Sequence, residues 1–340
     1  MLRLFLGLAA AFALTSAAAA KPLVVLLADE QGTEATDLLT PYAILAESGA
    51  VDVKVVSASL KPARLIPGMA WVAPQMTLAQ LAKARPAGPD VIIVPAMMIE
   101  DDPARSAWLR EQAAKGVRIM SICNGGLVLA SSGLLDGRQA TVHWFSRSKV
   151  AKKFPKVKWR YDQRWVTDGQ LTSTAGISAS EPASLNLLRS LAGDAVMRET
   201  AARMGLTAPD QRHDGQDYRL TAKGARLVVE NRVAFWEHEK VAVPLAPGFD
   251  ELAFATTLDA WSRTYRSLAW ATGASATVSR HGLTIYRSST PPSRFERTAR
   301  LPAANPVGAN FAAIGAAYGD PTARFVALQF EHPYGAISAW

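Results

Sequence analysis

A chain of 340 residues with 49% hydrophobic and 19% charged residues can bury a large core, which excludes an intrinsically disordered protein. The formal net charge of +8 is spread along the chain, and its densest basic run, residues 149–160, is short. Nucleic-acid-binding proteins usually gather positive charge on one face, so the composition favours a basic protein with no nucleic-acid partner.

The first 20 residues, MLRLFLGLAAAFALTSAAAA, have the pattern of a secretory signal peptide. A basic residue precedes an apolar stretch, and a run of alanines offers a small-residue cleavage site. We expect cleavage near Ala20, a periplasmic or secreted protein, and no stable membrane association afterwards. An uncleaved anchor is the alternative, although the apolar stretch is shorter than the roughly 20 residues that a membrane span needs.

Residues 21–206 alternate between buried strands and helices. Continuous apolar runs predict strands at 21–29, 51–59, 89–96 and 117–122, and a short strand at 137–144. Helical spacing predicts helices at 36–49, 78–84, 104–116, 180–193 and 195–205, and the stretch 158–176 predicts a hairpin that turns at Asp168-Gly169. This alternation predicts a doubly wound, mostly parallel α/β sheet, whose active sites lie at the carboxyl ends of the strands.

The part of the chain after residue 206 contains a weak sequence repeat of the first residues. Residues 207–240 are polar and predict a linker. Residues 241–340 then repeat the opening pattern of apolar strand, Gly-containing acidic loop, helix, second strand and short hairpin, without a cysteine. We interpret them as a partial, degenerate second copy of the first domain, with two unrelated βα units as the alternative. A second copy of this kind would form a pseudo-dimer within one chain, covering the surface that a homodimer would otherwise use.

Cys123 is the only cysteine, and it lies where a predicted strand turns into a predicted helix. This is the nucleophile-elbow arrangement, in which the side chain stands clear of the sheet. The positive end of the helix dipole favours a thiolate, so we expect a lowered thiol pKa. Gly125 and Gly126 keep the turn uncrowded for a ligand. The alternative is a buried cysteine that only packs.

The segment SICNGGLVLASSGLLDGRQATVHW resembles the elbow region of the ThiJ/PfpI family in the class I glutamine-amidotransferase-like superfamily. DLLTPY, DVIIVP and TSTAGISAS follow the family's order, and the resemblance covers residues 21–206. The nearest branch includes isonitrile hydratases and the N-terminal domains of some AraC-type regulators. The resemblance implies a flavodoxin-like fold, and dimers are frequent in the family.

The resemblance also implies roles for individual residues. Cys123 matches the elbow cysteine, and Asp37 matches an acid on the first helix that contacts the sulfur and acts as general acid or base. His143 matches a histidine near the pocket. For Asp37 the alternative is a helix N-terminal acid, and for His143 a structural histidine. Ser173, Thr174 and Gly176 match the loop that borders the site, and the other positions expected to contact the substrate are Ala96, Met97, Asn124 and Gly125.

Three departures bear on the activity. The family often has Pro-Gly-Gly where this chain has Pro95-Ala96-Met97, so the oxyanion hole is altered or filled. Asn124 replaces the His of the protease-like branch and the Thr of the hydratase branch. The segment 179–182 places Pro182 in the first turn of a late helix, instead of the usual glycine and acid.

Two functions remain open. The first is a cofactor-free, cysteine-dependent hydrolase or hydratase (lyase) that acts on a small molecule through Cys123. The second is a non-catalytic ligand-binding or thiol redox-sensing module on the same fold. The five histidines have no metal-ligand spacing, so we expect no metal. A transcription regulator is disfavoured because residues 241–340 predict no helix-turn-helix.

Overall fold

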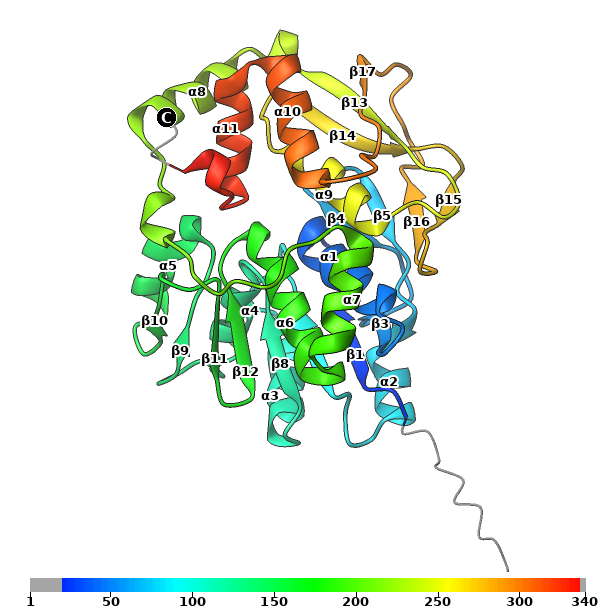
Figure 1. Ribbon diagram of the computed structural model, residues 1–340, viewed down its shortest axis with the longest axis vertical. Helices are drawn as coiled ribbons and strands as arrows, with labels where there is room; N and C mark the ends of the chain where they lie inside the picture. The colour runs from blue at the N-terminus through cyan, green and yellow to red at the C-terminus, as the bar shows by residue number, and fades with distance from the viewer. Residues whose placement is uncertain (1–19, 337–340) are drawn as a thin grey trace, which may run out of the picture.

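The first half of the chain is built around a seven-stranded sheet with the order β11-β12-β8-β7-β1-β3-β6. The computed structural model describes residues 20–336, and Figure 1 gives the arrangement. The strands are β1 (Leu23–Leu27), β3 (Asp52–Ser57), β6 (Met76–Thr77), β7 (Val91–Val94), β8 (Arg118–Ser121), β11 (Trp165–Asp168) and β12 (Leu171–Thr174). Only β11 runs antiparallel to its neighbour among these seven strands. The predicted mostly parallel sheet is therefore confirmed.

Helices cover both faces of this sheet, as its strands require. In β1, Val24 and Leu26 pack into one hydrophobic cluster, whereas Leu23, Val25 and Leu27 pack into another. The first cluster includes residues of α1 (Ala35–Glu47), α6 (Ser180–Ala192) and α7 (Asp194–Met204), and the second includes residues of α2 (Leu78–Ala84), α3 (Pro103–Ala114) and α4 (Gly125–Ser131). A strand buried on both faces explains why its sequence is continuously apolar rather than alternating.

Smaller elements complete the first half. Next to the sheet lie the short strands β9 (Gln139–Ala140) and β10 (Lys158–Trp159) and helix α5 (Arg147–Lys153). The strand expected over 137–144 is thus only two residues long. Residues 1–19 of the predicted signal peptide lie outside the described residues. Within residues 20–336, none of the helices has both the length and the apolar character needed to cross a membrane.

The second half forms its own parallel sheet, in the order β14-β13-β17. Its elements are β13 (Glu239–Pro244), α9 (Glu251–Ser262), β14 (Ser267–Thr272), β15 (Ala276–Val278), β16 (Thr284–Arg287), β17 (Arg297–Thr298), α10 (Pro306–Tyr318) and α11 (Asp320–Gln329). The order β13-α9-β14-β15-β16 matches β1-α1-β3-β4-β5 in the first half, where the two-residue strand β2 is additionally present between β1 and α1. The stretch 207–240, which we expected to be a linker, contains helix α8 (Ala222–Val233).

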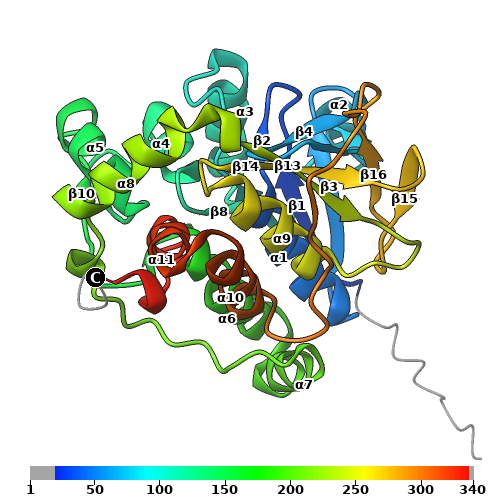
Figure 2. The same cartoon turned by 90° about the horizontal axis from the view of Figure 1, so that it is seen from above.

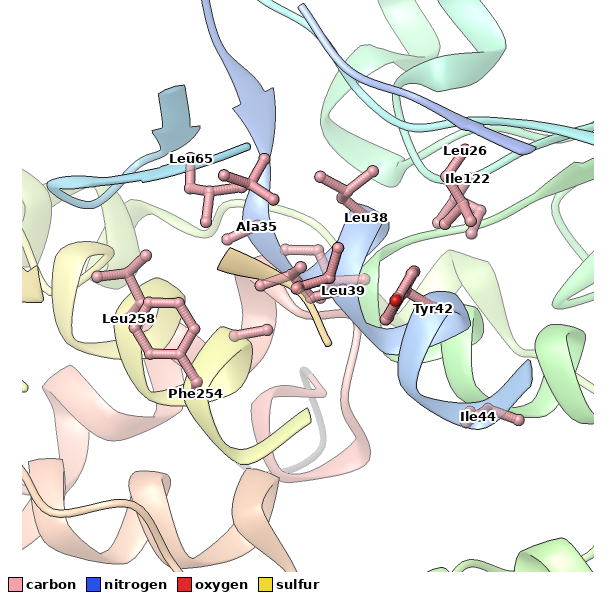
Figure 3. Packing of buried hydrophobic residues seen from close by; sticks show 14 of the residues in the cluster. Leu26, Ala35, Leu38, Leu39, Tyr42, Ile44, Leu65, Ile122, Phe254 and Leu258 are labelled. Atoms are coloured by element: carbon pink, nitrogen blue, oxygen red, sulfur yellow. The ribbon is translucent and has the colours of Figure 1, made fainter. Parts of the chain in front are cut away.

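The two halves are joined by a shared sheet and a shared helix pair. Strands β15 and β16 continue a five-stranded sheet with β5 (Ala70–Val72), β4 (Ala63–Ile66) and β2 (Thr33–Glu34) of the first half. Helix α9 packs along α1, and Figure 3 shows Phe254 and Leu258 of α9 facing the side of α1 that carries Ala35 and Leu39. Because one buried cluster includes side chains from both halves, they share a hydrophobic core.

We expect Leu258→Ala to lower the free energy of unfolding by about 2–4 kcal/mol, because the fully buried side chain leaves a cavity between α1 and α9. Urea denaturation followed by circular dichroism measures it, and one cooperative transition is expected. Val278→Ala, at a half-exposed position, is the control and should cost less than about 0.5 kcal/mol. Two separate transitions in the native protein would contradict a shared core.

Candidate active site

The strand-to-helix turn after β8 places Cys123 at the carboxyl end of the sheet, as predicted. Cys123 has a φ of 54°, a left-handed conformation that is uncommon for residues other than glycine. Its backbone N–H donates to the hydroxyl Oγ1 of Thr174 over 3.2 Å, which ties the turn to β12. A Cβ atom on Gly125 would lie 2.0 Å from the carbonyl oxygen of Val94, so this glycine is needed for close packing.

Two buried carboxyl groups accompany the thiol. Asp37, in the first turn of α1, accepts a hydrogen bond on Oδ2 from the backbone N–H of Ala96 over 3.1 Å. Its other oxygen, Oδ1, is buried and has no hydrogen-bond partner. Glu34 caps α1 by accepting from the backbone N–H of Asp37. Burial raises the pKa of Asp37 to about 7, and burial together with Asp259 and Asp37 raises that of Glu34.

The thiol itself is protonated at neutral pH, which corrects the expectation of a lowered pKa. Cys123 is 4% exposed, and burial, followed by the charges of Asp37 and Glu34, raises its pKa well above the ordinary value. A carboxylate beside a thiol disfavours the thiolate. Helix α4, whose dipole we expected to lower the pKa, has only seven residues. The dipole is therefore outweighed by burial and by two carboxyl groups.

An arginine from the second half reaches this site. Arg263, at the end of α9, donates from Nη2 to Oε1 of Glu34 over 3.1 Å and from Nε to Oδ1 of Asp259. Asp259 also accepts from the hydroxyl of Thr36 on α1 over 3.0 Å. The pKa of Arg263 is raised by Asp259 and Glu34, against the effect of burial. This cation offsets part of the negative charge around Cys123.

The C-terminal segment closes the site from another side. Glu331 accepts on Oε2 from the backbone N–H of Gly176 over 2.9 Å and bonds to Nε2 of His213 over 2.8 Å. It also accepts from the backbone N–H of Trp144. Although burial opposes it, these partners and the nearby His143 lower the pKa of Glu331 to about 2. The loop that ends at Gly176 is therefore held by a buried carboxylate from beyond α11.

His143 is fully engaged by the backbone. Its Nε2 bonds to the carbonyl of Gln329 over 2.8 Å, and its Nδ1 accepts from the N–H of Phe145 over 3.2 Å. Burial lowers its pKa, so the ring is neutral. With both ring nitrogens occupied, this geometry agrees with the structural alternative for His143 rather than with a catalytic role.

The other predicted residues surround the turn in different ways. Ala96 donates its N–H to Asp37 and accepts from the N–H of Glu34, so it offers no free N–H to an oxyanion. Met97 is buried and forms a bridge with Thr33. Asn124 is at the start of α4, with a buried Oδ1 that lacks a hydrogen-bond partner. Ser173 accepts on its hydroxyl from the N–H of Thr141 over 2.8 Å.

Sequence reasoning missed four of these residues. Glu34 lies three positions before Asp37 and had a local signal, because acids are common helix caps. Arg263, Asp259 and Glu331 had no local signal, since they reach the site only through the packing of the second half. In the region that the structure describes, no cluster of three or more His, Cys, Asp or Glu side chains fits a metal ion.

Comparisons with known proteins agree with this geometry. A model of the DJ-1/PfpI family matches residues 22–189. Isonitrile hydratase from Pseudomonas putida is 32% identical over 162 residues, which are 46% of this chain and 67% of that protein. The HTH-type transcriptional regulator CdhR from Pseudomonas aeruginosa is 32% identical over 130 residues. The chain spans only 38% of that regulator's length.

Solved structures resemble the first half. The crystal structure of Drosophila melanogaster DJ-1beta superposes with a TM-score of 0.47 at 20% identity, over 55% of this chain and all of that one. An AraC family transcriptional regulator from Pseudomonas putida gives the same TM-score at 17% identity, over 54% of this chain and 99% of that one.

We expect Asp37→Asn to change the free energy of unfolding, relative to the native protein, in a pH-dependent way. The variant should be more favourable at pH 8 than at pH 5. The pKa of Asp37 is about 7 when folded and near ~3.9 when unfolded, so its protonated form favours folding. That stabilisation is complete below the unfolded pKa and is lost as pH rises through 7. The asparagine does not titrate, so its advantage should grow by about 1–3 kcal/mol across this range.

Urea melts at several pH values measure this difference. Asp101→Asn, which removes the charge of an exposed carboxyl group, is the control for the substitution itself. Equal pH dependence in Asp37→Asn and the native protein would mean that Asp37 is ionised like an ordinary surface carboxyl group.

Proposed function

Because the chain belongs to the DJ-1/PfpI family, we propose that it is a cofactor-free cysteine enzyme acting on a small, neutral carbon electrophile. Cys123 is the nucleophile and Asp37 is the general base and acid. The observation that carries this proposal is the buried carboxyl group of Asp37, with a pKa of about 7 and an unpartnered oxygen, beside the left-handed cysteine. A group with a pKa near neutrality is suited to both removing and returning a proton.

Because the thiol of Cys123 is protonated at neutral pH, the proposed mechanism needs a step that activates it. A thiol is activated either by a lowered pKa or by an adjacent base, and here the second route applies. The carboxylate of Asp37 takes the thiol proton as the sulfur attacks, so no free thiolate has to persist in the buried site. Asp37 then passes the proton to the substrate.

Hydration of an isonitrile illustrates the balance of atoms. The sulfur bonds to the terminal carbon, and the proton taken by Asp37 is delivered to the same carbon, which gives a thioimidate. Water adds to that carbon with a proton on nitrogen. The carbon–sulfur bond then breaks, the thiol recovers its proton, and an N-substituted formamide leaves. Nitriles and small amides would react with the same nucleophile, Cys123, and the same general base, Asp37. The relative named isonitrile hydratase supports this choice of substrates.

The second candidate is a ligand-binding or thiol-sensing protein. Its ligand-binding form is favoured by the 4% exposure of Cys123 and by the use of the Ala96 N–H within the protein, whereas a buried thiol with a raised pKa is poorly suited to redox sensing. In either case the proposal includes export, which rests on the signal pattern of residues 1–20. The matches to regulators leave DNA binding outside this proposal, because they cover small parts of those proteins.

Turnover distinguishes the two candidates. We expect formamide production from a small alkyl isonitrile, followed by infrared or chromatographic assay, to be abolished in Cys123→Ser. Asp37→Asn should lower kcat by about 10²–10⁴-fold, and kcat of the native enzyme should fall as pH drops below 7, where Asp37 becomes protonated. Asp101→Asn should keep full activity. No turnover of isonitrile, nitrile or amide by the folded protein would rule out the enzyme.

Alkylation tests the state of the thiol independently of any substrate. We expect the rate of iodoacetamide modification of Cys123 to be slow at pH 7 and to rise without a plateau up to about pH 9, because the thiol pKa is raised. Asp37→Asn removes a neighbouring negative charge and should move the profile to lower pH. A plateau below about pH 7 would mean a preformed thiolate and would contradict the general-base mechanism.

A further inference from the structure

A cleft of about 480 Å³ lies between the two halves, and Cys123 is not among its lining residues. Its walls come from the beginnings of α1, α6, α9 and α10, and from the residues that follow α7 and α11. Seen from above in Figure 2, α10 of the second half overlies α6 of the first half. The volume lies in the range of small-molecule sites in proteins.

Two opposite charges face this cleft, and neither makes an ion pair within 4.0 Å among the described residues. Arg164 makes one long side-chain hydrogen bond, to the hydroxyl of Ser178 over 3.5 Å, and no ion pair within 4.0 Å. Glu181, in the first turn of α6, has no side-chain hydrogen bond and no ion pair within 4.0 Å, and burial raises its pKa against the opposing effect of the Arg164 charge. A half-buried charge without a partner is costly, so both groups favour a ligand that supplies one.

A third polar group points to a ligand. Thr40 of α1 lines the cleft, is 1% exposed, and its buried hydroxyl Oγ1 has no hydrogen-bond partner. A threonine inside a helix normally bonds to a carbonyl one turn earlier, as Thr256 of α9 does with Leu252. The hydroxyl of Thr40 is therefore left for a molecule within the cleft.

The rest of the cleft lining indicates the chemical character of the middle of the ligand. Apolar side chains also line the cleft, among them Ile177, Leu252, Val307 and Phe330. His332 also lines the cleft, but burial and Arg164 lower its pKa to about 4, so it adds no charge at neutral pH. The cleft thus combines the cation of Arg164, the carboxyl group of Glu181, a second carboxyl group on Asp210 that is already paired with Arg212, and an aliphatic surface.

We propose that this cleft binds a small aliphatic zwitterion, whose carboxylate pairs with Arg164 and whose ammonium group pairs with Glu181. Arg164 is well placed for this role because its own N–H donates to the carbonyl of Gln211 and its carbonyl accepts from the N–H of Ala175, both over 2.8 Å. Glu181 is fixed by α6. The ligand bridges the first and second halves, since Leu252 and Val307 belong to the second.

Isothermal titration calorimetry with 5-aminovalerate tests the proposal on the full chain without its first 20 residues. Pentanoate and pentylamine, which carry one charge each, are the matched probes. We expect saturable binding of 5-aminovalerate, weakened at least about tenfold in both Arg164→Gln and Glu181→Gln. Arg164→Gln should affect pentanoate but not pentylamine, and Glu181→Gln the reverse. Arg189→Gln, an exposed change on the same helix α6, should bind like the native protein.

Thr40→Val supplies a variant whose folding is not in question, because it removes an unpartnered buried hydroxyl and keeps the side-chain shape. It should weaken 5-aminovalerate binding severalfold without lowering the melting temperature. No binding up to about 10 mM would overturn the proposal, as would binding that all three substitutions leave unchanged. Binding of pentanoate as tight as that of 5-aminovalerate would overturn the role of Glu181.

Discussion

The ion network of Arg263 with Glu34 and Asp259 is the interaction on which the arrangement of the site depends. It lies where α9 packs on α1, and it joins a cation of the second half to the helix cap of the first. Breaking one partner of a buried ion pair leaves an uncompensated charge, which is far costlier than losing a surface pair. The orientation of α9 on α1 and the charge next to Cys123 are therefore set together.

That coupling explains why the thiol differs from an ordinary elbow cysteine. The first half supplies Asp37 and Glu34, which together with burial raise the pKa of Cys123, and the second half adds Arg263, whose charge offsets them in part. Proton transfer through Asp37 then becomes the natural route to a nucleophile, because the free thiolate is disfavoured.

The two halves share an element order but are not equivalent, and the difference creates the cleft. The N-terminal helix caps correspond, since Glu34 bonds to the N–H of Asp37 as Asp250 does to that of Ala253. At the third helical position, however, Asp37 has an alanine as its counterpart. The second half continues into α10 and α11, where the first half has its longer sheet and α6. The mismatch between these surfaces leaves the space lined by Arg164 and Glu181.

The sequence by itself determined the sheet, the helices around it and the position of Cys123, because these follow from local patterns. The continuous apolar run of β1 marks a strand buried on both faces, and the lone cysteine before Gly125 and Gly126 marks the turn. Asp37 could also be identified from the sequence, because of its position on the first helix. Tertiary structure alone decided the charge around the thiol, because Arg263 and Glu331 are more than a hundred residues away in the chain. It also decided the direction of the thiol pKa, since burial and the neighbouring Asp37 and Glu34 act on Cys123 only once the chain has folded.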